Sequence, residues 1–509
     1  MKRLACAIPS ATGIWCALTA LLFIQHQPEC PVSEEECRAY VHPSSVECLR
    51  ASGVLGESYP FAQSCLYKHL YVVDGTPTLF VTSEGAQHEA KEVTAMLNRD
   101  DFIGQFRPRV IEVVSAESLC ATHCIRLHDD LSVLGDFWLG NIGHALFDSL
   151  YSVFVSLIEH SNRHLTPFRL INTHTRRGAS PFVEGVIGQA PPLGMVYADA
   201  FFTDNPEFDT HLMRELLIPN FARCISCASD REPIHFGMDM GHDLDALRLL
   251  REHVRSRFGM PPSPPRSSRT ARSDAPLNTI AIDNKRFSDH DRHALSTALE
   301  ISGPRIQGAV IRWEGMPFRD QLHTLSNTRI HLSGVGTACV NQPFLPDGAI
   351  HINLGACERY PYQNNLFARL FRSEAYTTPI PSYMEQALVA ATPYHRALYY
   401  PLDELCNGLT TPRLRTLLKE AARLHDSAFP IPVPKGVNLA PTGRVVQALM
   451  RADPVFRRHL VDFVAHKDCA TGSFFWPEIV LQTGGPWDAG GSCKLNVTML
   501  RELKAQFLV

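Results

Sequence analysis

Apolar and polar stretches alternate along most of the chain, and the alternation is most regular between residues 279 and 354. Short apolar runs typical of buried strands are separated there by longer segments with apolar residues at helical spacing. Strands that alternate with helices in this way predict a parallel sheet covered on both faces. The expected strands are residues 279–282, 306–313, 329–332 and 349–354, and the expected helices are residues 289–301, 317–325 and 338–344.

The length of the chain, 509 residues, exceeds what one compact core normally holds, so we expect an α/β protein with two nucleotide-fold-sized domains. A stretch dominated by Pro, Ser and Arg cannot build a core and marks the boundary between them. The expected segments are a leader at residues 1–27, a stem at 28–58, a first domain at 59–258, a linker at 259–276, a second domain at 277–400 and a C-terminal extension at 401–509.

The leader begins with Lys2 and Arg3, which are followed by an uncharged run over residues 4–24. This pattern favours a signal-anchor helix that holds the protein to the membrane with its amino end in the cytoplasm. A cleaved signal peptide is the alternative, because the run is only moderately apolar. Either interpretation places the rest of the chain in the lumen of the endoplasmic reticulum or the Golgi apparatus.

Cysteine usage and charge narrow the class of protein further. The chain has 15 cysteines, most of them scattered beyond the leader, which favours disulfides in an oxidising compartment. Cys224 and Cys227 have the spacing of half a zinc site, but no second pair accompanies them, so a disulfide is favoured there too. Asn496 lies in a glycan acceptor sequon, which fits a secreted glycoprotein. A formal net charge of −4 gives no basic field, so nucleic acid is not an expected partner.

One candidate catalytic motif runs from Gly140 to Tyr151. Asn141 is a suitable N-cap for a helix that begins at residue 142, and the apolar residues after it recur at helical spacing. His144 and Asp148 are four residues apart and so project from one edge of the apolar stripe. A half-buried imidazole beside a carboxylate is suited to act as a general base near neutral pH. The alternative is a structural pair on an amphipathic core helix, which is common on helix faces.

A candidate anion site lies in the loop Ser333-Gly334-Val335-Gly336-Thr337, between an expected strand and an expected helix. The two glycines allow close approach of the backbone, and the N-terminus of the following helix offers unpaired N–H groups to a diphosphate. Lys285 and Arg286, just after the first strand of the same domain, are candidates to bind the leaving diphosphate. A tight structural turn and a solvated basic turn are the respective alternatives.

Together with a second stretch in the carboxy-terminal half, these motifs resemble glycosyltransferase family 61. This family includes the EGF-domain O-GlcNAc transferase and the plant β-1,2-xylosyltransferases. The first motif has the spacing Asn141-x-x-His144-x-x-x-Asp148-x-Leu150. The second runs through Phe318-Arg319-Asp320-Gln321-Leu322, Arg329-Ile330-His331, Ser333-Gly334-Val335-Gly336 and Phe344-Leu345-Pro346-Asp347-Gly348-Ala349. The similarity extends over about residues 136–355. The chain departs from the family at Ser333, where the loop normally has histidine, and at Asn353, where an acidic residue is usual.

The resemblance implies a GT-B architecture, in which two Rossmann-like domains face a central cleft. The first domain would bind the acceptor, with Asn141 on the acceptor side and His144 or Asp148 as the general base or as the group that orients it. The second domain would bind the donor. Its implied donor-binding residues are Lys285, Arg286, Ser333, Gly334, Gly336, Thr337 and Asn353. No metal or cofactor is implied besides the nucleotide-sugar donor. The Asp243-Leu244-Asp245 sequence, which could hold a cation, is better suited to cap the helix expected at residues 244–257.

The expected function is therefore an inverting glycosyltransferase that transfers GlcNAc or xylose from a UDP-sugar to a hydroxyl group of a glycan or glycoprotein acceptor. The alternative is a catalytically inactive lumenal homologue that binds a glycan or a nucleotide-sugar, which the residue Ser333 favours. An NAD-dependent enzyme is disfavoured, because the glycine loop follows the third strand of its domain and not the first.

Overall fold

The structure is a computed structural model of the chain, and it describes about three fifths of the residues. The described ranges are residues 30–50, 63–81, 105–112, 115–174, 178–204, 207–219, 244–263, 275–334, 337–359, 377–380, 394–401, 404–434 and 436–439, together with single residues and short pairs elsewhere. The expected leader at residues 1–27 lies outside these ranges, as do Cys224, Cys227, Asp243 and Asn496.

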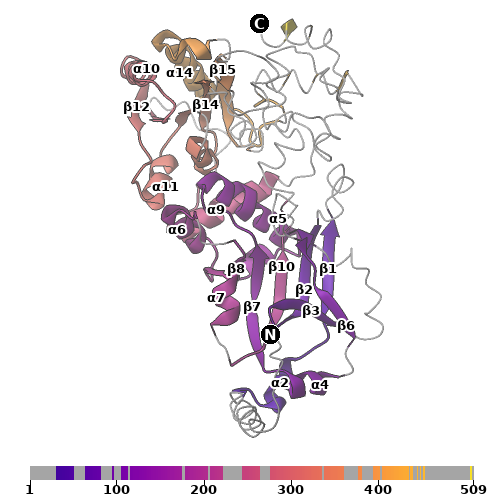
Figure 1. Ribbon diagram of the computed structural model, residues 1–509. Coiled ribbons are helices and arrows are strands. Elements are labelled where there is room, and N and C mark those ends of the chain that lie inside the picture. Colours follow the sequence, from indigo (N-terminus) through magenta and orange to yellow (C-terminus); the bar gives the residue numbers. More distant parts are fainter. Residues whose placement is uncertain are drawn as a thin grey trace, which may run out of the picture.

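A mixed sheet forms the core of the amino-terminal part (Figure 1). Its strand order is β6-β3-β2-β10-β7-β8-β9, and β1 pairs with β2. The strands β10, β7, β8 and β9 are parallel, whereas β2 runs antiparallel to β10. The strand bounds are β1 Ser45–Arg50, β2 Gln63–Val73, β3 Thr76–Val81, β6 Arg109–Glu112, β7 Ile125–Gly135, β8 Phe168–Asn172, β9 Met195–Tyr197 and β10 Thr210–Ile218, with a separate pair β4 Ala95–Met96 and β5 Gln105–Phe106.

Helices connect the parallel strands of the first sheet. A π-helix, η2, runs from His144 to Leu150 and continues into α5, so the two together link β7 to β8. The order β9-β8-β7-β10 is the 3-2-1-4 order of half a Rossmann fold. The helix bounds are α2 Glu34–Tyr40, α4 Ala116–Thr122, η2 His144–Leu150, α5 Tyr151–Glu159, η3 Arg163–Leu165, α6 Pro181–Gln189, α7 Ala198–Thr203 and α9 Leu244–Arg257.

A second sheet has the order β12-β11-β13-β14-β15, with β16 also paired to β14. All its pairings are parallel except that of β15. Leaving β15 aside, the order is 2-1-3-4-5, that of flavodoxin-like folds. The strands are β11 Leu277–Ile282, β12 Ile306–Ile311, β13 Ile330–Gly334, β14 Ile350–Arg359, β15 Thr377–Ile380 and β16 Arg396–Tyr399; the helices are α10 Asp289–Glu300, α11 Phe318–Ser326, η6 Thr337–Phe344, η7 Leu405–Asn407 and α14 Thr411–Asp426.

The α/β class and the element pattern expected from the sequence are confirmed. The helix α9 has the bounds predicted for it, and α10 begins where its capping box places it, with Ser288 bonded to the backbone N–H of Asp291. The expected helix at residues 338–344 is instead a 3₁₀ segment that contains Pro343. Proline lacks the N–H that an α-helix would use at that position. The strand β16 belongs to the second sheet, and the helix α14 packs against that sheet. The first part of the expected C-terminal extension is therefore part of the second domain's core.

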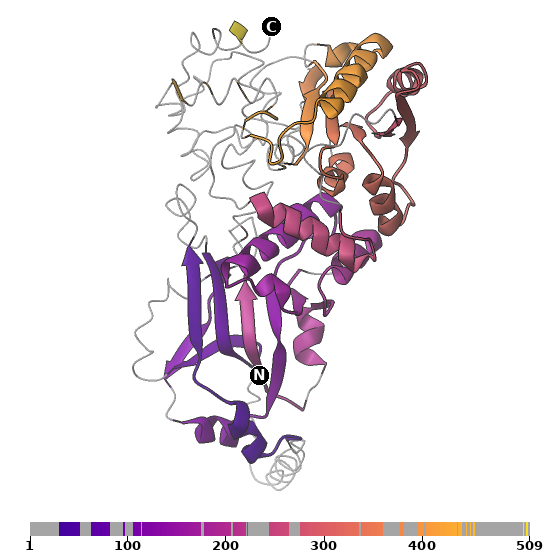
Figure 2. The same cartoon turned by 180° about the vertical axis from the view of Figure 1, so that it is seen from behind.

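The helices α5 and α9 lie between the two sheets in both views (Figures 1 and 2). One continuous apolar cluster includes buried residues of β7, η2, α5, α9, β11 and α11, so the two sheets share part of their core. The opposite face of the second sheet is covered by α10 and α14, which contribute Leu295, Leu414 and Leu418 to a separate cluster. Burial of such clusters is the main contribution to stability.

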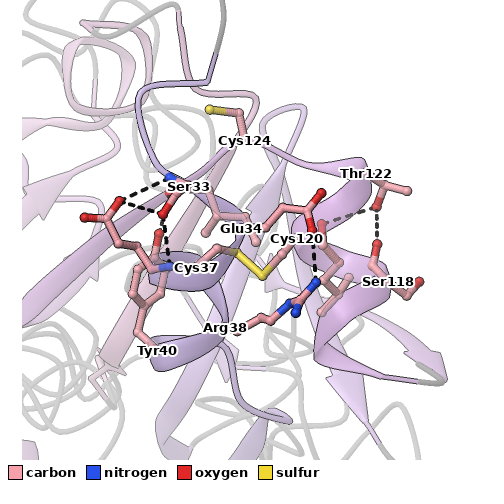
Figure 3. The surroundings of a disulfide bond; sticks show 12 residues. Ser33, Glu34, Cys37, Arg38, Tyr40, Ser118, Cys120, Thr122 and Cys124 are labelled. Carbon is pink, nitrogen blue, oxygen red and sulfur yellow. Dashed lines mark hydrogen bonds and ion pairs between the residues drawn. A yellow bond between two sulfur atoms is a disulfide. The ribbon is translucent and has the colours of Figure 1, made fainter.

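Three disulfides join described cysteines, which confirms that the chain forms disulfides, as cysteine usage predicted. They are Cys30–Cys124, Cys37–Cys120 and Cys48–Cys65. Figure 3 shows the second of them, which links α2 to α4. The first two therefore fasten the segment before β1 to the amino end of β7. No helix in the described ranges is both long enough and apolar enough to span a membrane.

Candidate functional site

Both candidate motifs lie where open α/β sheets bind ligands. Such sites occur beyond the carboxyl ends of parallel strands, where crossovers from neighbouring strands leave in opposite directions. In the first sheet this point lies between β7 and β10, and in the second it lies between β11 and β13. The carboxyl ends of the parallel strands in the first sheet point toward α9 and the second sheet (Figures 1 and 2). The first motif follows β7, whereas Lys285 and Ser333 lie at the ends of β11 and β13.

A cavity of about 730 Å³ lies between the two sheets. Ile142 and Phe182 line it from the first sheet's side, and residues 282–286 and 312–317 line it from the second. Among the described residues, four cationic side chains line it, against two acidic ones, Asp283 and Glu314. The cationic residues are Lys285, Arg286, Arg292 and Arg312. A cavity of this size accommodates a nucleotide-sized ligand, and the excess of positive charge favours an anionic one.

The two predicted basic residues, Lys285 and Arg286, are exposed and line this cavity. The turn that carries them is fixed by the buried Asn284, whose side-chain oxygen accepts a hydrogen bond from the backbone N–H of Arg286 at 3.0 Å. The backbone N–H of Phe287 donates to the carbonyl of Asn284 at 2.9 Å. Both cations are therefore held on a fixed turn immediately after β11.

Asp283 organises two further arginines at the rim. Its carboxylate accepts hydrogen bonds from Arg292 at 2.8 Å and from Arg312 at 2.6 Å. Burial alone would raise the pKa of Asp283, but the hydrogen bonds from the two arginines outweigh it, so the pKa lies below its usual value. The carboxylate thus stays ionised at neutral pH and keeps the two guanidinium groups together at the cavity.

Gly334, in the glycine loop, is more enclosed than the sequence suggested. A Cβ atom on Gly334 would lie 2.8 Å from the ring of Phe287 and 3.0 Å from the side-chain nitrogen of Asn284. Close packing by these two side chains therefore accounts for glycine at this position. Gly336 lies outside the described residues, and Thr337 begins η6, with a side chain that is not described.

Ser333 and Asn353 are neighbours in the register of β13 and β14, and both side chains are buried. The side-chain oxygen of Asn353 accepts a hydrogen bond from the N–H of Gly355 at 3.0 Å. The hydroxyl of Ser333 and the amide nitrogen of Asn353 have no hydrogen-bond partner in the described structure. These two unpaired polar groups lie side by side on adjacent strands, although buried polar atoms are normally satisfied.

On the other side of the cavity, Asn141 caps the helix that carries the first motif. Its side chain accepts a hydrogen bond from the N–H of Gly143 at 2.8 Å, as predicted. The first part of the expected α-helix is instead the π-helix η2, which contains His144 and Asp148. Phe147 and Leu150, in the same π-helix, are buried. π-Helical turns are uncommon and occur frequently at functional sites. The structure describes the position of Asp148 but not its side chain.

Trp138 lies in no motif and was not predicted as a site residue. This residue lies in the loop between β7 and η2, its side chain is 47% exposed, and its ring centre is 4.9 Å from that of His144. Gly140 makes room for it, since a Cβ atom there would lie 2.7 Å from the indole nitrogen. The loop thus presents a flat aromatic side chain beside the candidate catalytic histidine.

An imidazole–carboxylate pair that the sequence did not indicate lies at the same end of the first sheet. Nδ1 of His174, just after β8, is 2.6 Å from a carboxylate oxygen of Asp136, just after β7. The two side chains are 32% and 25% exposed. The spacing of 38 residues between them carries no sequence signal, which is why the pair was missed. It arises because β7 and β8 are parallel neighbours with Gly135 opposite Asn172.

Among the described residues, no group of three or more His, Cys, Asp or Glu side chains is arranged to hold a metal ion. No protein-family model matches the chain, and a search of curated proteins finds no match. The functional assignment therefore depends on the motifs and on the geometry of the cavity.

Proposed function

We propose that the protein is an inverting glycosyltransferase of GT-B type that uses a UDP-sugar, with GlcNAc or xylose as the sugar. Its acceptor would be a hydroxyl group of a glycan or glycoprotein in the lumen of the endoplasmic reticulum or the Golgi apparatus. The observation that supports this most is the cationic cavity between the two sheets, which Lys285 and Arg286 line on one side and Ile142, from the first motif, on the other.

In this proposal the diphosphate of the donor lies against Lys285 and Arg286. Transfer breaks the bond between the anomeric carbon and the diphosphate oxygen, so negative charge grows on the leaving group. Fixed cations that face this charge stabilise the transition state. Asp283 contributes indirectly, because it positions Arg292 and Arg312 at the rim of the same cavity. Ser333 and Asn353, with their unpaired polar atoms, remain candidates for contacts with the donor.

The acceptor lies, in this proposal, at the carboxyl end of the first sheet. Its hydroxyl oxygen attacks the anomeric carbon from the face opposite the diphosphate, which inverts the configuration. The hydroxyl must lose its proton in this step, so a general base is required on the acceptor side. His144 and Asp148 on η2 are proposed to accept this proton or to orient the group that does.

The test is a panel of UDP- and GDP-sugars with detection of the transferred sugar, using the purified full-length chain. We expect turnover with a UDP-sugar. In the Lys285→Ala variant we expect the donor KM to rise about tenfold, because a charge-assisted contact is lost. Lys419→Ala is the matched control, since Lys419 is an exposed lysine on α14, outside the cavity.

The alternative function gives a different result in the same panel. A protein that only binds nucleotide-sugars would show saturable donor binding, weakened by Lys285→Ala, with no product formed. The buried Ser333 in place of the family's loop histidine is the feature that supports this alternative.

A further inference from the structure

The pair formed by His174 and Asp136 has the geometry of a general base and the carboxylate that orients it. The short distance of 2.6 Å between Nδ1 and the carboxylate indicates that Nδ1 carries the proton and donates it to Asp136. Nε2 of His174 is then an acceptor with a free lone pair. Within the described part of the chain, Nε2 has no hydrogen-bond partner, and about a third of the side chain is exposed. The imidazole is thus partly accessible from solvent at the carboxyl end of the first sheet.

The backbone around this pair is fixed by one buried side chain. Asn172, only 1% exposed, accepts hydrogen bonds from the N–H groups of Phe137 and His174, each at 2.9 Å. Its amide nitrogen also donates to the carbonyl of Phe137 at 3.2 Å. Because Phe137 follows Asp136 directly, a single amide group sets the relative position of the carboxylate and the imidazole. A site built on strand ends in this way is more rigid than one carried by a free loop.

The same loop connects the pair to the wall of the cavity. The backbone N–H of Ser180, the residue before α6, donates to the carbonyl of Leu139 at 2.9 Å. Phe182 of α6 and Ile142 line the cavity. The residues from Asp136 to Ile142 therefore run from the imidazole–carboxylate pair, past Trp138, to the cavity itself.

From this geometry we infer that His174 is the catalytic base of the proposed transfer and that Asp136 is its positioning residue, which rests on the proposed function. The acceptor oxygen forms a bond to the anomeric carbon while the bond to the diphosphate oxygen breaks. The nucleoside diphosphate leaves with the electron pair, and the proton of the acceptor hydroxyl passes to Nε2 of His174. Asp136 stabilises the imidazolium that results, and water later takes the proton. In this assignment His144, whose ring lies 4.9 Å from that of Trp138, does not accept the proton but contacts the acceptor.

The experiment compares His174→Gln and Asp136→Asn with a matched pair at the opposite end of the sheet. Nδ1 of His123 lies 3.5 Å from Asp209, near the amino ends of β7 and β10, so His123→Gln and Asp209→Asn remove an equivalent imidazole–carboxylate contact far from the cavity. All variants are assayed for sugar transfer from the UDP-sugar that the wild type uses, across a range of pH. Thermal unfolding is measured in parallel.

We expect His174→Gln to lower kcat by on the order of 10²–10⁴-fold, with an unchanged donor KM and an unfolding temperature close to that of the wild type. The decline of kcat on acidification should disappear in this variant. Asp136→Asn should give a smaller loss and displace the same decline along the pH axis. The His123 and Asp209 variants should transfer sugar like the wild type.

Each remaining outcome overturns the assignment in a recognisable way. If the wild type transfers sugar and His174→Gln does so equally well, His174 is not the base while the proposed function stands. If His174→Gln is inactive but the pH profile of Asp136→Asn equals that of the wild type, the carboxylate has no role in positioning. If the wild type transfers no sugar from any donor, the proposed function and this assignment both fail.

Discussion

The guanidinium of Arg251 lies 2.9 Å from the carboxylate of Asp347, and the two side chains are 0% and 6% exposed. Arg251 belongs to α9, between the sheets, whereas Asp347 lies in the turn between η6 and β14 of the second sheet. The guanidinium also donates to the carbonyl of Leu345 at 3.2 Å and lies 4.3 Å from the centre of the Tyr394 ring. This buried ion pair joins the central helix to the layer that carries the proposed donor site.

Replacement of Arg251 should therefore be costly. In Arg251→Ala the carboxylate of Asp347 stays buried and loses its buried partner, which typically lowers the free energy of unfolding by about 3–5 kcal/mol, and only the more distant Arg248 remains. The matched control is Arg248→Ala, because Arg248 lies 3.8 Å from the same carboxylate but is 48% exposed, and such pairs contribute roughly 0–1 kcal/mol. Denaturant unfolding monitored by circular dichroism measures both. Equal losses in the two variants would contradict this account of the interface.

Three buried histidines form a cluster on the face of the second sheet that is turned toward η6. His331 and His351 are neighbours in β13 and β14, with their Nδ1 atoms 2.9 Å apart. His395 lies beside them and contacts the carbonyl of Leu345 through Nε2 at 3.0 Å. Burial lowers the pKa of His331 and of His395 to about 3, and it lowers the pKa of His351 well below the usual value. All three imidazoles are therefore neutral in the folded protein.

The direction of the resulting pH dependence follows from these lowered pKa values. The unfolded chain protonates these three histidines below about pH 6.5, whereas in the folded chain burial lowers the pKa of His331 and His395 to about 3 and that of His351 well below its usual value. In this window the unfolded state binds more protons, so the free energy of unfolding falls as the pH falls, by about 1 kcal/mol per pH unit for each histidine. Urea unfolding at a series of pH values should show this slope. It should be smaller in His351→Gln and unchanged in His323→Gln, a variant of an exposed histidine in α11. A stability that does not vary between pH 6.5 and 4 would contradict the prediction.

Local patterns made much of the fold predictable from the sequence. The helix α10 follows a Ser–Asp capping box, and β11 and β13 are short apolar runs, so their positions depend on residues close in the chain. The placement of His144 and Asp148 on one helix was predictable for the same reason, because both lie in a short run with helical periodicity, but the π-helical form of this turn was not. The α/β class followed from these elements together.

The parts that could not be predicted depend on pairing between distant segments. Asp136 and His174 meet only because β7 and β8 are parallel neighbours in one particular register. The unpaired groups of Ser333 and Asn353 become neighbours through the register of β13 and β14. The packing of Phe287 on Gly334 likewise joins two loops that no spacing rule connects. The sequence around a glycine at the end of a strand does not show whether a ligand or an aromatic side chain packs against it.

Trp138 and Gly140 provide a test of the acceptor side that leaves the candidate acids and bases unchanged. A Cβ atom on Gly140 would lie 2.7 Å from the indole nitrogen of Trp138, so the indole must move when alanine is introduced. Since Trp138 is 47% exposed, this movement should have little effect on stability. If the indole contacts the acceptor, Gly140→Ala should raise the acceptor KM by roughly two- to tenfold, the effect expected from disturbing one aromatic contact. The donor KM should stay the same.

Trp138→Ala should show the same selective change, because both variants remove the indole from its present position. The control for a glycine-to-alanine change is Gly185→Ala in α6, where a Cβ atom meets nothing within 4 Å. That variant should transfer sugar normally and gain up to about 1 kcal/mol of stability from its higher helix propensity. Steady-state kinetics, with the donor and acceptor concentrations varied separately, distinguish a change in the acceptor KM from a change in the donor KM. A rise in the donor KM of Gly140→Ala, or no kinetic change in Trp138→Ala, would place the acceptor away from this loop.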